Sequence, residues 1–276
     1  MQFTKATLVV AAFAVHTVLG AASKAPFANP KSGGGSMLTS TGQKGGEPLN
    51  VIISGASDPA VLSKDGFASW TESIKFKPND CLQAQNTDPS LEGVQKANLG
   101  DGNGMVPQAG LMREHDACSE VFTGGNHFRY WFQNGKKANT GAVFLAASVE
   151  KPIREHHDIV KNGYDLGRDH LVANATGGTT TDSDGNQYQT RVSYDQTLLK
   201  GIKTSEINHN IGINGSVAIL TVKRTKTGSK SNNSAASLRA FSPQHASLLV
   251  LVAVVIITPL LLSLIHISEP TRQEAI

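Results

Sequence analysis

Two histidines, two arginines and an aspartate have spacings that could bring them together as a site. His127 and Arg129 alternate along a predicted β-strand, so their side chains share one face about 7 Å apart. Asp165 and Arg168 stand three positions apart on a predicted helix, which makes them neighbours on its surface. Together with His157, such residues could bind a metal, hold an anionic group such as phosphate, or transfer protons in catalysis.

The same five residues have a simpler interpretation, which is a hydrogen-bonded network that fixes a helix against a sheet. Buried polar clusters often perturb charged groups without taking part in catalysis. The chain has no nucleophile elbow, HExxH pair, P-loop or dinucleotide fingerprint. Both interpretations therefore stay open, and the sequence indicates no particular metal or cofactor.

Five strands are expected to carry or surround these residues. An apolar, β-branched run predicts a buried strand, and strict alternation of Phe128, Tyr130 and Phe132 with His127 predicts a second strand with two different faces. Asn134-Gly135 is a strong hairpin signal after that strand. The strands are expected over residues 48–54, 126–133, 141–149, 188–195 and 213–223.

Two helices complete the predicted fold. The first is expected to start with Ser57 and Asp58 as caps and Pro59 in the first turn, and the second to cover residues 164–174. The order β-α-β-β-α-β with one extra strand predicts an α+β fold, a split βαβ sandwich of the ferredoxin-like kind. Residues 79–123 are irregular and rich in turn formers, so we expect a long ordered loop there.

The two cysteines, Cys81 and Cys118, bracket this loop. An oxidising compartment favours pairing them, and in the chain-entropy model the bond would stabilise the fold by about 4 kcal/mol. No CxxC spacing accompanies them, which argues against a metal pair or a catalytic thiol. The sequence therefore predicts a loop stapled by a disulfide.

The N-terminus has the composition of a secretory leader. Lys5 precedes an apolar run that ends in small residues, which is the order found in a cleavable signal peptide over residues 1–22. The run is too short to span a bilayer, which needs about 20 apolar residues. Residues 23–46 are rich in Gly, Ser, Thr and Lys, and we expect a flexible leader there.

The C-terminal region predicts an anchor. Residues 225–246 form a polar stalk and spacer with small residues at Asn233 and Ser234, and residues 247–264 are almost wholly apolar. Small site, spacer and apolar tail are the signal for a glycosylphosphatidylinositol anchor at Asn233 or Ser234. The alternative is a single transmembrane helix, which a cluster of Lys and Arg would normally follow. Residues 262–276 resemble a translated sequencing-library adapter, so they enter no argument about a site.

The glycosylation sequons and the net charge of the chain indicate where it is located and which kinds of partner it can have. Three acceptor sequons, at Asn174, Asn214 and Asn232, mark positions that can carry glycan in a secreted chain. The formal charge of +3 is modest, and the basic residues near the stalk have no interleaved aromatics, which argues against a nucleic-acid partner. The chain is therefore expected in the secretory pathway, then on the extracellular face of the plasma membrane or in the cell wall.

A set of short motifs over residues 48–175 suggests a family. In chain order they are Pro48-Leu-Asn-Val-Ile-Ile-Ser-Gly55, His127-Phe-Arg-Tyr-Trp131, Gly141-Ala-Val-Phe-Leu-Ala146, His156-His-Asp-Ile-Val160 and Asp165-Leu-Gly-Arg-Asp169. The chain resembles the LssY C-terminal-like domain, in particular secreted fungal proteins built on it, which places that domain at residues 47–224. The resemblance implies a fold and a candidate surface without supplying a reaction. Asp158 departs from the family's usual His-His-Ile order.

These observations predict a surface-anchored extracellular domain that acts as a binding or cell-wall-associated module. Its partners would be the membrane, through a lipid anchor or a single transmembrane helix, and a cell-wall glycan or lipid-phosphate ligand. The alternative is a hydrolase that acts on a phosphate-containing or glycan substrate through His127, His157 and Asp165.

Overall fold

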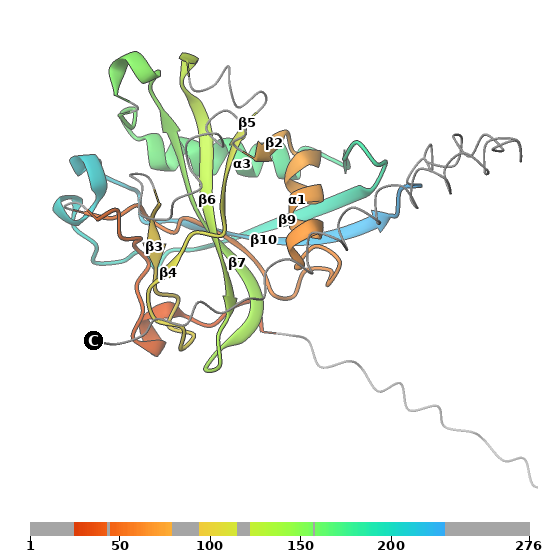
Figure 1. The fold of residues 1–276 in the computed structure, drawn as a ribbon, viewed down its shortest axis with the longest axis horizontal. Coiled ribbons are helices and arrows are strands. Elements are labelled where there is room, and N and C mark those ends of the chain that lie inside the picture. The colour runs from red at the N-terminus through yellow and green to blue at the C-terminus, as the bar shows by residue number, and fades with distance from the viewer. Residues whose placement is uncertain (1–24, 43–44, 79–93, 115–121, 157, 230–276) are drawn as a thin grey trace, which may run out of the picture. The chain divides into compact units, whose positions relative to one another are not determined.

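The computed structural model describes residues 25–42, 45–78, 94–114, 122–156 and 158–229, which belong to one compact unit. An eight-stranded mixed sheet curls into a half-barrel, accompanied by a two-stranded sheet and two α-helices (Figure 1). The strands are β1 (Val51–Ile53), β2 (Phe76–Pro78), β3 (Lys96–Ala97), β4 (Val106–Pro107), β5 (Gly110–Glu114), β6 (Gly125–Asn134), β7 (Asn139–Glu150), β8 (Thr180–Thr181), β9 (Gln187–Asp195) and β10 (Val217–Lys226). The helices are α1 (Lys64–Ser73) and α3 (Gly163–Thr176), and short 3₁₀ turns are η1 (Pro30–Gly33), η3 (Ile153–Glu155), η4 (Thr204–Glu206) and η5 (Asn208–Asn210).

The predicted ferredoxin-like sandwich is wrong. The large sheet has the order β2-β5-β6-β7-β1-β10-β9-β8, and β1 pairs parallel with β10 but antiparallel with β7. The prediction missed β2, β5 and β8, because strands of two to five residues are too short to show a period. Those short strands extend both edges of the sheet and make the fold mostly β.

The expected loop over residues 79–123 is also corrected. Its described part forms the small β3–β4 sheet and then β5, which pairs with β6 in the large sheet. No disulfide occurs among the residues that the structure describes, so the stapled loop has no support. Cys81 and Cys118 themselves lie outside those residues.

The longer elements follow the sequence pattern. β1, β6, β7, β9 and α3 form where strands and a helix were predicted, within a few residues at each end. α1 begins later than expected, at Lys64, because Ser63 is its N-cap and accepts a hydrogen bond from the Gly66 N–H at 3.1 Å. The earlier capping signal belongs to a turn, in which the Asp58 side chain accepts from the Ala60 N–H at 2.9 Å.

The two faces of β6 enter different cores, as its alternation predicted. Phe128 and Tyr130 join the cluster that packs against the helices, which includes Phe67 of α1 and Leu171 of α3. Figure 1 shows α3 crossing behind β6 and β7. Trp131 faces the other cluster, which is covered by non-helical segments before β1 and before β10. This second face of the sheet is the face that carries His127 and Arg129, and Tyr164 at the start of α3 packs nearby against Ile207.

The long β6–β7 ribbon has two distinct ends. At its turn, the buried Asp101 carboxylate accepts hydrogen bonds from the Gly135 N–H at 3.0 Å and the Asn134 N–H at 3.3 Å. At the other end Gly125 pairs with Glu150, and the chain continues through η3 into α3. The candidate residues gather at this second end, which we call the open end of the ribbon.

Candidate functional site

A buried charge cluster lies on the second face of the sheet, the one that carries Trp131, and it comprises Glu47, Arg113, His127, Arg129 and Glu150. The Glu150 carboxylate lies 3.3 Å from His127 Nε2 and 3.2 Å from Arg113 Nη1. Arg129 Nη1 contacts His127 Nε2 at 3.2 Å and the Glu47 carboxylate at 3.2 Å. Strand register explains the contacts, because Arg113 on β5 and Ser148 on β7 are the cross-strand neighbours of His127.

The charge cluster is almost closed to solvent, and Arg129 is its most exposed member. His127 is fully buried, and Glu47, Arg113 and Glu150 are each less than one-tenth exposed. Two arginines face two glutamates, so their formal charges balance inside the fold. Burial, and then the negative charge of Glu47, raises the pKa of the nearby Tyr164 hydroxyl well above its usual range. Such a cluster holds strands in place, since each buried charge depends on its partners.

A second group, the α3 latch, joins α3 to the segment that leads into β10. Buried Arg168 donates to Asp165 at 3.2 Å, to Asn214 Oδ1 at 2.8 Å and to the Ser216 carbonyl at 2.8 Å. Its Nε also lies 2.8 Å from Asp169. Burial raises the pKa of the Asp165 carboxyl, although Arg168 and the Asn214 N–H act in the opposite direction.

The five residues singled out in the sequence thus fall into two groups and one unplaced residue. His127 contacts Arg129, and Asp165 contacts Arg168. Among the described residues, no hydrogen bond or ion pair links the charge cluster to the α3 latch. His157 lies outside the described residues.

Sequence reasoning missed the carboxylates of the charge cluster. Glu47 and Glu150 have no motif around them, and they reach His127 and Arg129 only through the pairing of distant segments. One signal was available for Glu150, because it is the only charged residue in the apolar strand over residues 139–150. A buried charge at the end of such a strand needs a partner.

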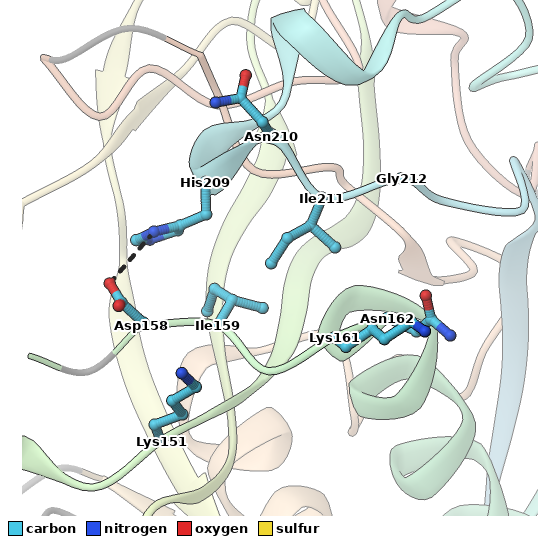
Figure 2. A pocket seen from close by; sticks show the side chains of 9 residues that line it. All are labelled: Lys151, Asp158, Ile159, Lys161, Asn162, His209, Asn210, Ile211 and Gly212. Carbon is cyan, nitrogen blue, oxygen red and sulfur yellow. Dashed lines mark ion pairs between the residues drawn. The ribbon is translucent and has the colours of Figure 1, made fainter. Parts of the chain in front are cut away.

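An open cavity of about 610 Å³ lies at the open end of the ribbon, and we call it the lysine cavity. Figure 2 shows His209 pointing at Asp158, with Nδ1 3.5 Å from the carboxylate oxygen. Lys151 lies on one side and Lys161 with Asn162 on the other, with apolar side chains between them. The lining residues are Lys151, Asp158, Ile159, Lys161, Asn162, His209, Asn210, Ile211 and Gly212.

Three residues that line the cavity have left-handed backbones. The φ angles are +59° at Asn162, +60° at His209 and +53° at Asn210. This conformation costs a non-glycine residue roughly 1 kcal/mol, although Asn and His tolerate it better than most. Asn162 is also the N-cap of α3, yet its side chain makes no capping hydrogen bond. The cavity wall therefore includes an Asn162 side chain that makes no capping hydrogen bond, and three residues with strained backbone. Strained backbone often occurs at binding sites.

A second open cavity, of about 520 Å³, lies at the turn end of the ribbon. It is lined mainly by apolar and amide groups, with Phe132 and Leu62 beside Asn134 and Asn139. Neither it nor the lysine cavity is lined by a member of the charge cluster. Among the described residues, no group of three or more His, Cys, Asp or Glu side chains could hold a metal ion.

Two of the three sequons lie among the described residues. Asn214 is exposed, and it is the side-chain oxygen that accepts from Arg168 and from the Ser216 N–H, which leaves its nitrogen for a glycan. Asn174 is half-buried, and its nitrogen donates to Glu114 at 2.8 Å. Asn232 lies outside the described residues, as do Asn233 and Ser234.

No protein-family model, curated protein or solved structure matches the chain. The resemblance to the LssY C-terminal-like domain therefore stays a prediction. In the part of the chain that the structure describes, no helix is long and apolar enough to cross a membrane. The predicted signal peptide, the anchor segment over residues 247–264 and the adapter-like residues 262–276 lie outside that part.

Proposed function

We propose that this chain is a surface-anchored extracellular binding module that takes an anionic ligand in the lysine cavity. The observation that carries the proposal is the contrast in access. The candidate residues His127 and Arg168 are buried and tied to internal partners, whereas the lysine cavity opens to solvent with cationic groups on its walls. Its volume lies within the usual range for small-molecule sites.

The cavity wall favours a negative group. Lys151, Lys161 and the imidazole of His209 supply hydrogen-bond donors, and the N-terminus of α3 adds its positive dipole beside Asn162. The single lining carboxylate, Asp158, is already engaged by His209. The nearby Glu155 lies 3.7 Å from Lys151 and offsets part of that charge, so the second lysine matters most for affinity.

The cavity floor favours a ligand with an apolar part. Ile159 and Ile211 line the cavity, and Figure 2 shows their side chains between His209 and the segment of Lys161 and Asn162. An inorganic anion would contact only one side of such a site, while a phosphate joined to a sugar ring or a glycerol unit could use the floor as well. The shared chemistry is a phosphate ester, from a cell-wall glycan or from a lipid headgroup.

The test is a calorimetric titration of the full chain with inorganic phosphate, with a hexose phosphate and with vesicles that contain phosphatidic acid. We expect Lys161→Gln to weaken binding of the preferred ester roughly tenfold, which corresponds to about 1.4 kcal/mol. Lys223→Gln is the matched control, because Lys223 is exposed near the far end of β10. Equal binding by both variants, or no phosphate binding by the unmodified chain, would overturn the proposal.

A hydrolase is the second candidate, and one observation favours it. A histidine oriented by a carboxylate can act as a general base, and His209 and Asp158 form such a pair within an open cavity. The hydrolase would then use this pair in place of the buried His127. The His209→Asn variant separates the two functions, because Asn tolerates the left-handed backbone but cannot transfer a proton. Turnover of a phosphate ester that this variant loses, while it still binds the ester, would establish the enzyme.

A further inference from the structure

Two large apolar side chains stand exposed at the open end of the ribbon. Phe122, just before β6, is 66% exposed, and Ile153, just after β7, is 46% exposed. Their segments are adjacent, because Gly124 packs against the backbone of Glu150 to Pro152. Exposed apolar residues are unremarkable when they are scattered singly. Here two of them project from neighbouring loops at one end of the molecule.

Basic side chains lie in the loop that carries Ile153. Arg154 follows Ile153 directly and is 79% exposed, and Lys151 is 40% exposed. Both contact a single carboxylate, that of Glu155, at 3.9 and 3.7 Å. Lys161 adds a further positive charge, and Asp158 is paired with His209. Among these described residues three basic side chains accompany two carboxylates, which leaves a net positive charge near the apolar tips.

We propose that the open end of the ribbon docks on an anionic lipid surface, with Phe122 and Ile153 inserted among the headgroups. Aromatic and aliphatic tips ringed by Lys and Arg are typical of segments that lie in a membrane interface. The inference rests on the proposed function, since Lys151 belongs both to this surface and to the lysine cavity. Under this proposal, the phosphate ester that binds in the lysine cavity belongs to a lipid headgroup.

The length of the chain is compatible with such docking. If residues 247–264 form the alternative transmembrane helix, 17 residues, 230–246, separate that helix from the described domain. A chain of that length can extend at most about 60 Å. The single-pass alternative therefore leaves a long tether for docking, whereas a lipid anchor at Asn233 or Ser234 would hold the domain on only four or five residues beyond residue 229.

The experiment places a fluorescent reporter at the tip of the full chain. The Phe122→Trp variant is conservative and exposed, and the native Trp70 and Trp131 are buried, so they are shielded from lipid. The chain is bound to vesicles of phosphatidylcholine, with or without phosphatidylglycerol, whose acyl chains carry bromine. Met105→Trp is the matched control, because Met105 is 50% exposed and adjoins β4 near the turn end of the ribbon.

We expect bromine to quench the emission of the Phe122→Trp variant in anionic vesicles, with a blue shift, and to leave the Met105→Trp variant unaffected. Equal quenching of the two variants, or none, would overturn the docking. Binding of inorganic phosphate by the same protein keeps the two proposals distinguishable. If the protein binds phosphate but shows no quenching, the docking proposal is wrong and the lysine cavity stands. If it shows quenching but binds no phosphate, the docking is supported and the lysine cavity is not its phosphate site.

Discussion

The charge cluster and the lysine cavity are both built around a histidine and a carboxylate, yet they occupy opposite environments. His127 lies 3.3 Å from Glu150 inside the fold, and His209 lies 3.5 Å from Asp158 at the surface. The first pair is enclosed by arginines, whereas the second faces solvent between lysines on a strained backbone. The comparison teaches that burial, and not residue type, separates a structural pair from a pair that can meet a ligand.

The largest effect is expected from making the same substitution in both pairs. Glu150→Gln would leave Arg113 and His127 buried without their counter-charge, and we expect unfolding in urea to show a loss of about 3 kcal/mol. Asp158→Asn is the matched change at the surface, and it should cost no more than about 0.5 kcal/mol, because exposed pairs contribute little. Similar losses for the two variants would break the comparison.

A smaller effect is expected from adding one methyl group near each site. Gly167 of α3 lies against β7, and a Cβ there would come within 2.5 Å of the Ser148 backbone. Gly167→Ala should therefore push α3 off the sheet and cost about 2 kcal/mol in a thermal or urea unfolding curve. Gly212→Ala, in the lysine cavity, meets nothing closer than 3.8 Å and should leave stability unchanged. A neutral Gly167→Ala variant would mean that the packing beside the charge cluster is loose.

The smallest effect concerns the α3 latch, which is intermediate in exposure. Burial raises the pKa of Asp165 above its ordinary value of 3.8, so the folded state binds this proton more tightly than the unfolded chain does. The stability that this group contributes is full below pH 3.8 and is lost as the pH rises through the raised pKa. In urea unfolding, the difference in unfolding free energy between the wild type and Asp165→Asn should therefore decrease as the pH rises from 3.8 through the raised pKa. If this difference instead increases with pH, the effect of Arg168 on the Asp165 pKa is larger than the effect of burial.

The sequence was sufficient to predict the elements whose hydrophobic pattern repeats over many residues. Alternation from His127 to Trp131 assigned both faces of β6, and the Asn134-Gly135 signal located the hairpin. The sheet order was beyond it, because β2, β5 and β8 are short and their pairing depends on distant segments. The same limit applied to the sites. His127 and Arg129 were found as a pair, but neither the carboxylates that neutralise them nor the left-handed turn at His209 leaves a periodic signal.

The parallel pairing of β1 with β10 affects how the chain can fold. These neighbours in the interior of the sheet come from opposite ends of the domain, and the Ser57 side chain accepts from the Val222 N–H across 165 residues of chain. Contacts of such high sequence separation slow folding, because a long loop must close before they form. β1 can pair with β7 early, but the edge of β1 that faces β10 stays unpaired until the last strand has been synthesised. A nascent chain that stops short of residue 217 would expose an apolar strand edge, and it would depend on a chaperone to avoid aggregation.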